Sequence, residues 1–231
     1  MGEIMSTLVL PQFVFSEIVA TVNRTRDGLE TGVKLFGTVL GDNSPSHAYV
    51  VLAIAGPSQK ATHQPAHYSG DADYATDIFA ALGCAMPGIK WLGEMHVHPR
   101  GMTWLSGGDR RTVRDILTGS DDTVHPDEFI AGIMQRKHGA IEIYPYHFTR
   151  ESLQGNPIAV HLVADEASLI EQARLKAIEK GTKNDRPSIC PQPEGSRAAQ
   201  GKTPRHHRLR QWWQRLGAYG RTIRHWQVNA R

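Results

Sequence analysis

Hydrophobic positions in the first 180 residues switch repeatedly between helical spacing and the short apolar runs typical of strands. Apolar residues at steps of three and four predict helices over Leu10–Arg24, Ala72–Met86, Ser106–Leu117 and Ala164–Lys180. Runs of β-branched and apolar residues predict strands over Gly28–Gly41, Tyr49–Ala55, Ile89–His98, Phe129–Gln135, Ala140–Phe148 and, at an edge, Ile158–Val163. This alternating order predicts an α/β or α+β domain, with a mixed sheet flanked by helices, over about residues 1–180.

The chain changes character after residue 180. Residues 181–204 are rich in Pro, Gly, Ser and Lys and lack periodicity, which predicts a linker. Residues 205–231 are predicted to form a basic amphipathic helix, weakened by Gly217 and Gly220. Its apolar positions, at steps of three and four, are Leu209, Trp212, Trp213, Leu216, Tyr219, Ile223 and Trp226.

Charge is distributed unevenly along the chain. The formal net charge is +3, but residues 195–231 contain nine Lys or Arg and no Asp or Glu, so residues 1–194 carry −6, from 17 basic and 23 acidic residues. For the basic helix we favour packing on the acidic body or docking to a partner protein, such as a conjugation-pathway enzyme. An anionic membrane surface and nucleic acid remain the alternatives.

Several classes of protein are not supported by the sequence. No run of 18 apolar residues and no secretory cleavage pattern is present, so we expect a soluble, cytoplasmic protein. Only two cysteines, Cys84 and Cys190, occur, far apart, which disfavours a disulfide framework or a Cys-rich zinc site.

The stretch Gly93–Asp109, GEMHVHPRGMTWLSGGD, concentrates residues that bind metals. His96 and His98 lie two apart on a predicted strand, so both imidazoles project to one face. Ser106 begins the next predicted helix, and Asp109 lies in its first turn, where it can return over the two histidines. Two imidazoles and one carboxylate form a catalytic zinc set that leaves a fourth position for water.

HVHP followed by LSGGD, that is His-x-His, seven residues and Ser-x-x-Asp, resembles the motif of the JAMM (MPN-plus) zinc metalloproteases. GEMHVHP and SGGDRRT are most similar to the prokaryotic JAB branch. The resemblance covers about residues 5–180. It implies an MPN/JAB-like fold with a cytidine-deaminase-like layout and the metal at one sheet edge.

The same resemblance implies roles for individual residues. His96, His98 and Asp109 would bind one Zn²⁺ per chain with a bound water, Glu30 in LETGVKLFG would hold that water, and Ser106 would stabilise the oxyanion. Val97 stands where Ser or Thr is common in the family, and Thr103–Leu105 stand where a Pro is frequent. The second departure affects the shape of the loop and therefore the substrate groove.

Simpler interpretations stay open beside these roles. A capping box alone accounts for Ser106 and Asp109 but not for the histidine spacing. Glu94 is the nearest alternative base, although support of a metal ligand through a hydrogen bond fits it better. His63 and His67 could line the cleft, but loop histidines are usually solvated, and Cys84 is a further candidate ligand.

The resemblance implies a zinc isopeptidase or peptidase, similar to a deubiquitinase, that cuts after the C-terminal glycine of a ubiquitin-like protein. It could deconjugate that protein or process its precursor. One alternative is a JAB hydrolase that acts on a sulfur-carrier protein or a small amide. A non-enzymatic alternative is an MPN-like scaffold or nucleic-acid-binding module, which the intact set of five residues disfavours.

Overall fold

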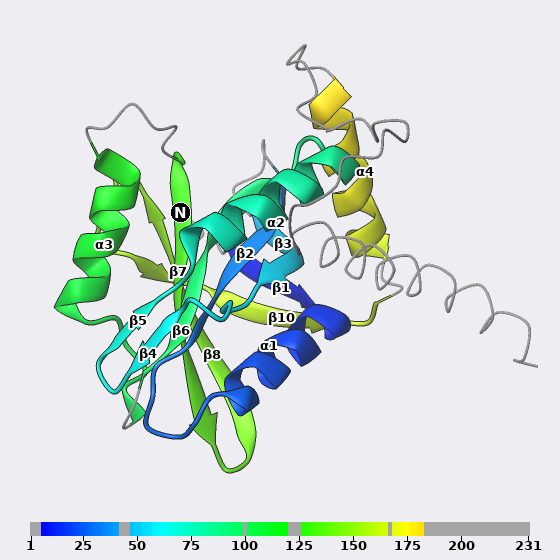
Figure 1. Ribbon diagram of the computed structural model, residues 1–231. Coiled ribbons are helices and arrows are strands. Elements are labelled where there is room, and N and C mark those ends of the chain that lie inside the picture. The colour runs from blue at the N-terminus through cyan, green and yellow to red at the C-terminus, as the bar shows by residue number, and fades with distance from the viewer. Residues whose placement is uncertain (1–5, 42–46, 99–100, 120–125, 166–167, 183–231) are drawn as a thin grey trace, which may run out of the picture. The chain divides into compact units, whose positions relative to one another are not determined.

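The computed structural model describes residues 6–41, 47–98, 101–119, 126–165 and 168–182 (Figure 1). Within them, the strands of the large sheet are β1 (Thr7–Pro11), β2 (Gly32–Leu40), β3 (Ala48–Ala55), β6 (Lys90–Val97), β7 (Glu128–Lys137), β8 (Ala140–Thr149), β9 (Asn156–Pro157) and β10 (Ala159–Val163). The helices are α1 (Gln12–Arg24), α2 (Ala72–Ala85), α3 (Gly107–Thr118) and α4 (Ser168–Thr182). A separate hairpin consists of β4 (Thr62–Gln64) and β5 (His67–Ser69).

The large sheet is mixed, with the strand order β10-β1-β3-β2-β6-β7-β8-β9. Strands β6 and β7 are parallel, and α3 lies in the crossover between them, as parallel neighbours require. Only Ile158 separates β9 from β10, which form opposite edges of the sheet. The sheet therefore curls until its two edges meet, and the backbone N–H of Ile158 donates to the carbonyl of Pro145 on β8 at 3.1 Å.

Alternate residues of the strands build separate cores on the two faces of the sheet. On one face, α1 packs through Val14, Ile18 and Val22 against the strands. On the other face, α3 packs on β7, and α4 packs on β1 and β3. The stacked rings of Phe36 on β2 and Phe79 on α2 place α2 on this second face, which also carries the side chain of His96. Figure 1 shows α3 and α1 as separate layers beside the strands.

The predicted domain with a mixed sheet flanked by helices is confirmed, and it fits the α+β class. Most boundaries shift by a few residues, but Leu10 and Pro11 were wrongly assigned to a helix. They end β1, because both residues pair with β10, and this pairing outweighs the local helical spacing. Asp165, predicted to lie in the last helix, instead accepts a hydrogen bond from the N–H of Phe13 at the start of α1.

The hairpin β4–β5 and strand β9 were not predicted, because each strand is only two or three residues long. None of the helices in the described residues has the length and apolar character that a membrane crossing requires. Apart from residues 181 and 182, which end α4, the predicted linker and the basic helix lie outside the described residues.

A partly buried polar cluster joins β3, β7 and β8. The hydroxyl of Tyr49 donates to Oε2 of Glu128 at 2.7 Å, and Nε2 of His147 lies 3.2 Å from the same oxygen. The bond with His147, followed by the bond with Tyr49, lowers the pKa of Glu128 below its ordinary 4.5 against the opposing effect of burial. Because the folded pKa lies below the unfolded value, the ionised carboxylate stabilises the fold above about pH 4.5, and this stability is lost as the pH falls.

We therefore expect Glu128→Gln to unfold at a lower temperature than the native protein at pH 7. The difference should shrink as the pH falls from about 4.5 through the lowered pKa of folded Glu128, because the native carboxyl then becomes neutral as well and has nearly the shape of the amide. Thermal unfolding followed at pH values from 7 to 3 measures both effects. Glu17→Gln, at an exposed position of α1, is the matched control. A difference in unfolding temperature that stays constant with pH would contradict the assignment.

Candidate metal centre

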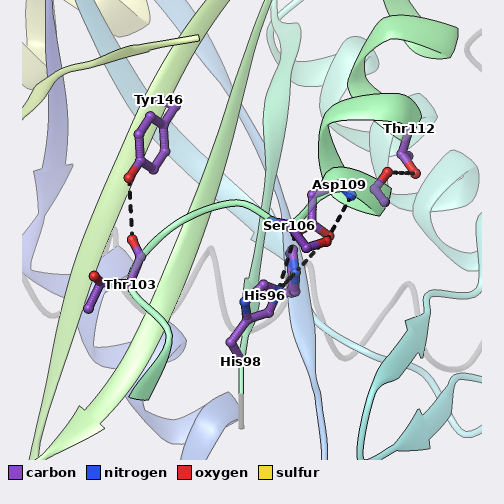
Figure 2. A network of polar contacts seen from close by, with 8 residues as sticks. His96, His98, Thr103, Ser106, Asp109, Thr112 and Tyr146 are labelled. Carbon is purple, nitrogen blue, oxygen red and sulfur yellow. Dashed lines mark hydrogen bonds and ion pairs between the residues drawn. The ribbon is translucent and has the colours of Figure 1, made fainter. Parts of the chain in front are cut away.

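The end of β6 and the start of α3 bring His96, His98 and Asp109 together. His96 lies on β6 and His98 directly follows the strand, so their side chains emerge on the same face. The crossover from β6 to β7 carries α3 back over this face, with Asp109 in its first turn. Figure 2 shows both imidazoles directed at the carboxylate of Asp109.

The three side chains are spaced like ligands of one metal ion. Nε2 of His96 lies 3.3 Å from Oδ1 of Asp109, Nε2 of His98 lies 3.3 Å from Oδ2, and the two nitrogens are 2.7 Å apart. Ligands at roughly 2.0–2.1 Å from a tetrahedral zinc ion lie about 3.3 Å from one another. The ligand atoms of the three side chains all lie within 4.8 Å of one another, so the group can hold a metal ion.

The start of α3 fixes the carboxylate of Asp109. The backbone N–H of Ser106 donates to Oδ2 of Asp109 at 2.6 Å, and Oγ of Ser106 accepts from the backbone N–H of Asp109 at 3.2 Å. This is the predicted capping box, and it coexists with the cluster of metal ligands. Burial raises the pKa of Asp109, but hydrogen bonds from His96, His98 and Ser106 together lower it well below its ordinary range. The carboxylate is thus held ionised, as metal binding requires.

Glu30 reaches the same site from a distant part of the sequence. It lies two residues before β2, and the first residue of that strand, Gly32, pairs with His96 on β6. Its side chain is buried and lines a pocket together with the three candidate ligands. Burial raises the pKa of Glu30. The nearby His96 and His98 act to lower the pKa of Glu30, whereas the negative charge of Asp109 raises it further.

The pocket has a volume of about 830 Å³. The end of the pocket at the candidate ligands is polar and includes Ser106, whereas the part between α3 and β7 is lined mainly by apolar side chains. These are Leu105, Val113, Ile116, Phe129 and Ala131. The arrangement therefore places the charged candidate metal centre beside an apolar surface large enough to contact part of a ligand.

Glu94 also lines the pocket, but it forms an ion pair with Lys34, whose ammonium lies 4.9 Å from the centre of the Trp91 ring. This partner makes Glu94 a weaker candidate than Glu30 for the proton-accepting group. Cys84 lies on α2 and does not belong to the ligand group found in the described residues.

The hairpin β4–β5 carries His63 and His67, which the sequence predicts to be solvated loop residues that could also line the cleft; His67 is exposed and His63 is half-buried. His67 lines the pocket and interacts electrostatically with Glu30, and Nδ1 of His63 lies 2.9 Å from the carbonyl oxygen of Glu30. Tyr68, for which the sequence predicts no role, donates a hydrogen bond from its hydroxyl to the carbonyl of Gly32 at 3.2 Å. The sequence carries little signal for this hairpin, because each of its strands is only three residues long.

Comparison with known proteins adds little to this picture. No protein-family model and no curated protein sequence matches the chain. One similar solved structure is the solution structure of protein DSY2949 from Desulfitobacterium hafniense, a structural genomics target. It is 16% identical, the match covers 68% of this chain and 93% of that one, and the TM-score is 0.47. A likeness at this level carries no inference about fold or function.

Proposed function

We propose that this protein is a zinc-dependent isopeptidase or peptidase of the JAMM type, with an MPN/JAB-like layout of its domain. The observation that carries the proposal is the convergence of His96, His98 and Asp109 with the buried carboxylate of Glu30 in one pocket. Local sequence brings the first three together, but Glu30 arrives from more than sixty residues upstream. If Glu30 had no role in the site, its charged side chain would be expected in solvent at the surface. It is instead buried beside the candidate ligands.

Zinc is the metal that this donor set fits best. Imidazole nitrogens suit zinc, and two of them with one carboxylate leave one tetrahedral position open. When bound, zinc supplies Lewis acidity, which activates water and polarises the carbonyl group of an amide.

The remaining chemistry falls to two side chains of this chain. Glu30 accepts a proton from water and passes it to the leaving amine, and a pKa raised by burial brings its carboxylate closer to the working pH of such a group. Ser106 stabilises the negative charge that develops on the carbonyl oxygen. Because Oγ of Ser106 accepts the N–H of Asp109, its own hydroxyl hydrogen can be donated into the pocket.

We propose the C-terminal glycine of a ubiquitin-like protein as the site of cleavage. This part of the proposal rests on the resemblance of HVHP and LSGGD to the JAMM motif. A glycine tail has no bulky side chains near the bond to be cut, so it can approach a metal flanked by Leu105 and Ser106.

Metal analysis combined with a cleavage assay tests the proposal. We expect about one zinc per chain and cleavage of a linear ubiquitin-like fusion after its terminal glycine. Incubation with a chelator should abolish cleavage, and added zinc should restore it. A chain that binds no zinc would overturn the enzymatic proposal. Zinc binding with hydrolysis of small amides alone would overturn the proposed substrate while leaving the reaction class intact.

A further inference from the structure

The hairpin β4–β5 binds the main chain of Glu30 on both sides. The backbone N–H of Glu30 donates to the carbonyl of Gln64 at 2.9 Å. The carbonyl of Glu30 in turn accepts from Nδ1 of His63 at 2.9 Å. A carbonyl oxygen can only accept, so this contact requires the tautomer, or the protonated ring, in which Nδ1 carries a hydrogen.

Glu30 lies outside the ladder of the large sheet. The pairing of β2 with β6 begins at Gly32, and the carbonyl of Thr31 accepts from the N–H of Val97 at 2.7 Å. In the described part of the chain, the main-chain hydrogen bonds found for Glu30 go to the hairpin. The hairpin, rather than the sheet, therefore sets the orientation of this residue.

The ring of His63 is itself held in place. It packs against Tyr68, with ring centres 5.5 Å apart, and the hydroxyl of Tyr68 is anchored on the carbonyl of Gly32. A Cβ atom at Gly32 would come within 2.5 Å of the Tyr68 ring, so the close approach depends on glycine at this position. Tyr68, His63 and the main chain of Glu30 form one connected unit beside the metal pocket.

We propose that His63 is a positioning residue for Glu30. Its imidazole fixes the peptide plane that follows Glu30, and with it the direction in which the side chain enters the pocket. Proton transfer requires a carboxylate within hydrogen-bond reach of the reacting group. A misplacement of about 1 Å costs on the order of a hundredfold in rate. The catalytic part of this inference rests on the proposed function, whereas the structural part does not.

Two variants separate the hydrogen bond from the bulk of the ring. His63→Leu keeps the volume that packs against Tyr68 but removes the donor. His63→Asn restores a donor, because the side-chain nitrogen of Asn occupies nearly the position of Nδ1. The matched control is His161→Ala, at an exposed position on β10. None of the changes touches His96, His98 or Asp109, so zinc content should stay at one per chain.

For cleavage of the ubiquitin-like fusion, we expect His63→Leu to lower kcat by about ten- to a hundredfold, with KM changed less than about twofold. His63→Asn should recover most of the lost kcat, and His161→Ala should match the native protein. A rise in KM with unchanged kcat would overturn the proposal, because it would place His63 in substrate binding. Equal losses in His63→Leu and His63→Asn would overturn it as well, because the donor would then not matter.

Amide hydrogen exchange gives a readout that does not depend on activity. The N–H of Glu30 is protected only while the hairpin stays docked through Gln64. We expect faster exchange of this amide in His63→Leu, near-native exchange in His63→Asn and native exchange in His161→Ala. Native protection of the Glu30 amide in His63→Leu would overturn the positioning role. If the native protein cleaves no substrate, the proposed function fails, and the exchange measurement still decides whether His63 holds Glu30.

Discussion

Glu30→Gln should keep one zinc per chain and lose at least about a hundredfold in the rate of cleavage, because general acid–base groups contribute roughly 10²–10⁴-fold. The amide has nearly the shape of the carboxylate but cannot take up a proton. Glu30 does not belong to the ligand group of His96, His98 and Asp109, so metal binding should survive. Zinc content and kcat, measured on the same preparation, test both halves of this expectation.

The matched control for this variant is Glu94→Gln. Glu94 also lines the pocket, but its carboxylate is paired with Lys34, so we expect kcat to change by less than about tenfold. Full activity in Glu30→Gln would remove Glu30 from its role. A large loss in Glu94→Gln, with full activity in Glu30→Gln, would transfer that role to Glu94.

The candidate ligands could be predicted from sequence because local geometry nearly determines them. Residues two apart on a strand share a face whatever the rest of the fold does, which placed His96 beside His98. Ser106 and Asp109 interact through a capping box that spans only one helical turn. The single non-local step was the return of α3 over β6, and it follows from the crossover between parallel strands.

The surroundings of Glu30 could not be predicted in the same way. Its buried state depends on a hairpin more than thirty residues away and on pairing of Gly32 with His96, neither of which leaves a periodic signal near Glu30. The three-residue strands of that hairpin are too short for an alternating pattern to stand out. The interpretation of His63 as a solvated loop residue failed for this reason.

A similar competition between local and distant interactions explains the error at Leu10. Its spacing relative to Phe13 and Val14 is helical, yet it is fully buried in a strand that pairs on both sides. Main-chain pairing with β10 and burial of the side chain outweigh a local helical preference, which is worth only tenths of a kcal/mol per residue. The nearby helix instead begins at Gln12, with its Phe13 N–H bound by Asp165 from far along the chain.

Asp109→Asn should bind zinc at least about a hundredfold more weakly than the native protein and lose cleavage at ordinary zinc concentrations. Changes in groups that only support metal ligands already cost roughly 10–100-fold in affinity, and loss of a ligand should cost at least as much. The amide oxygen of Asn can still accept the N–H of Ser106, so the start of α3 should persist and the helical circular dichroism should be unchanged. Competition with a chromophoric zinc chelator measures the affinity.

This variant separates the two roles of Asp109, because the hydrogen bond at the helix start needs an acceptor whereas the metal needs a charged ligand. Asp115→Asn, at an exposed position of the same helix, is the matched control and should bind zinc with native affinity. Native zinc affinity in Asp109→Asn would mean that the carboxylate is not a ligand. The capping box alone would then account for Asp109. The third metal ligand would have to come from another group in the pocket, and the candidate is Glu30, which is also a buried carboxylate.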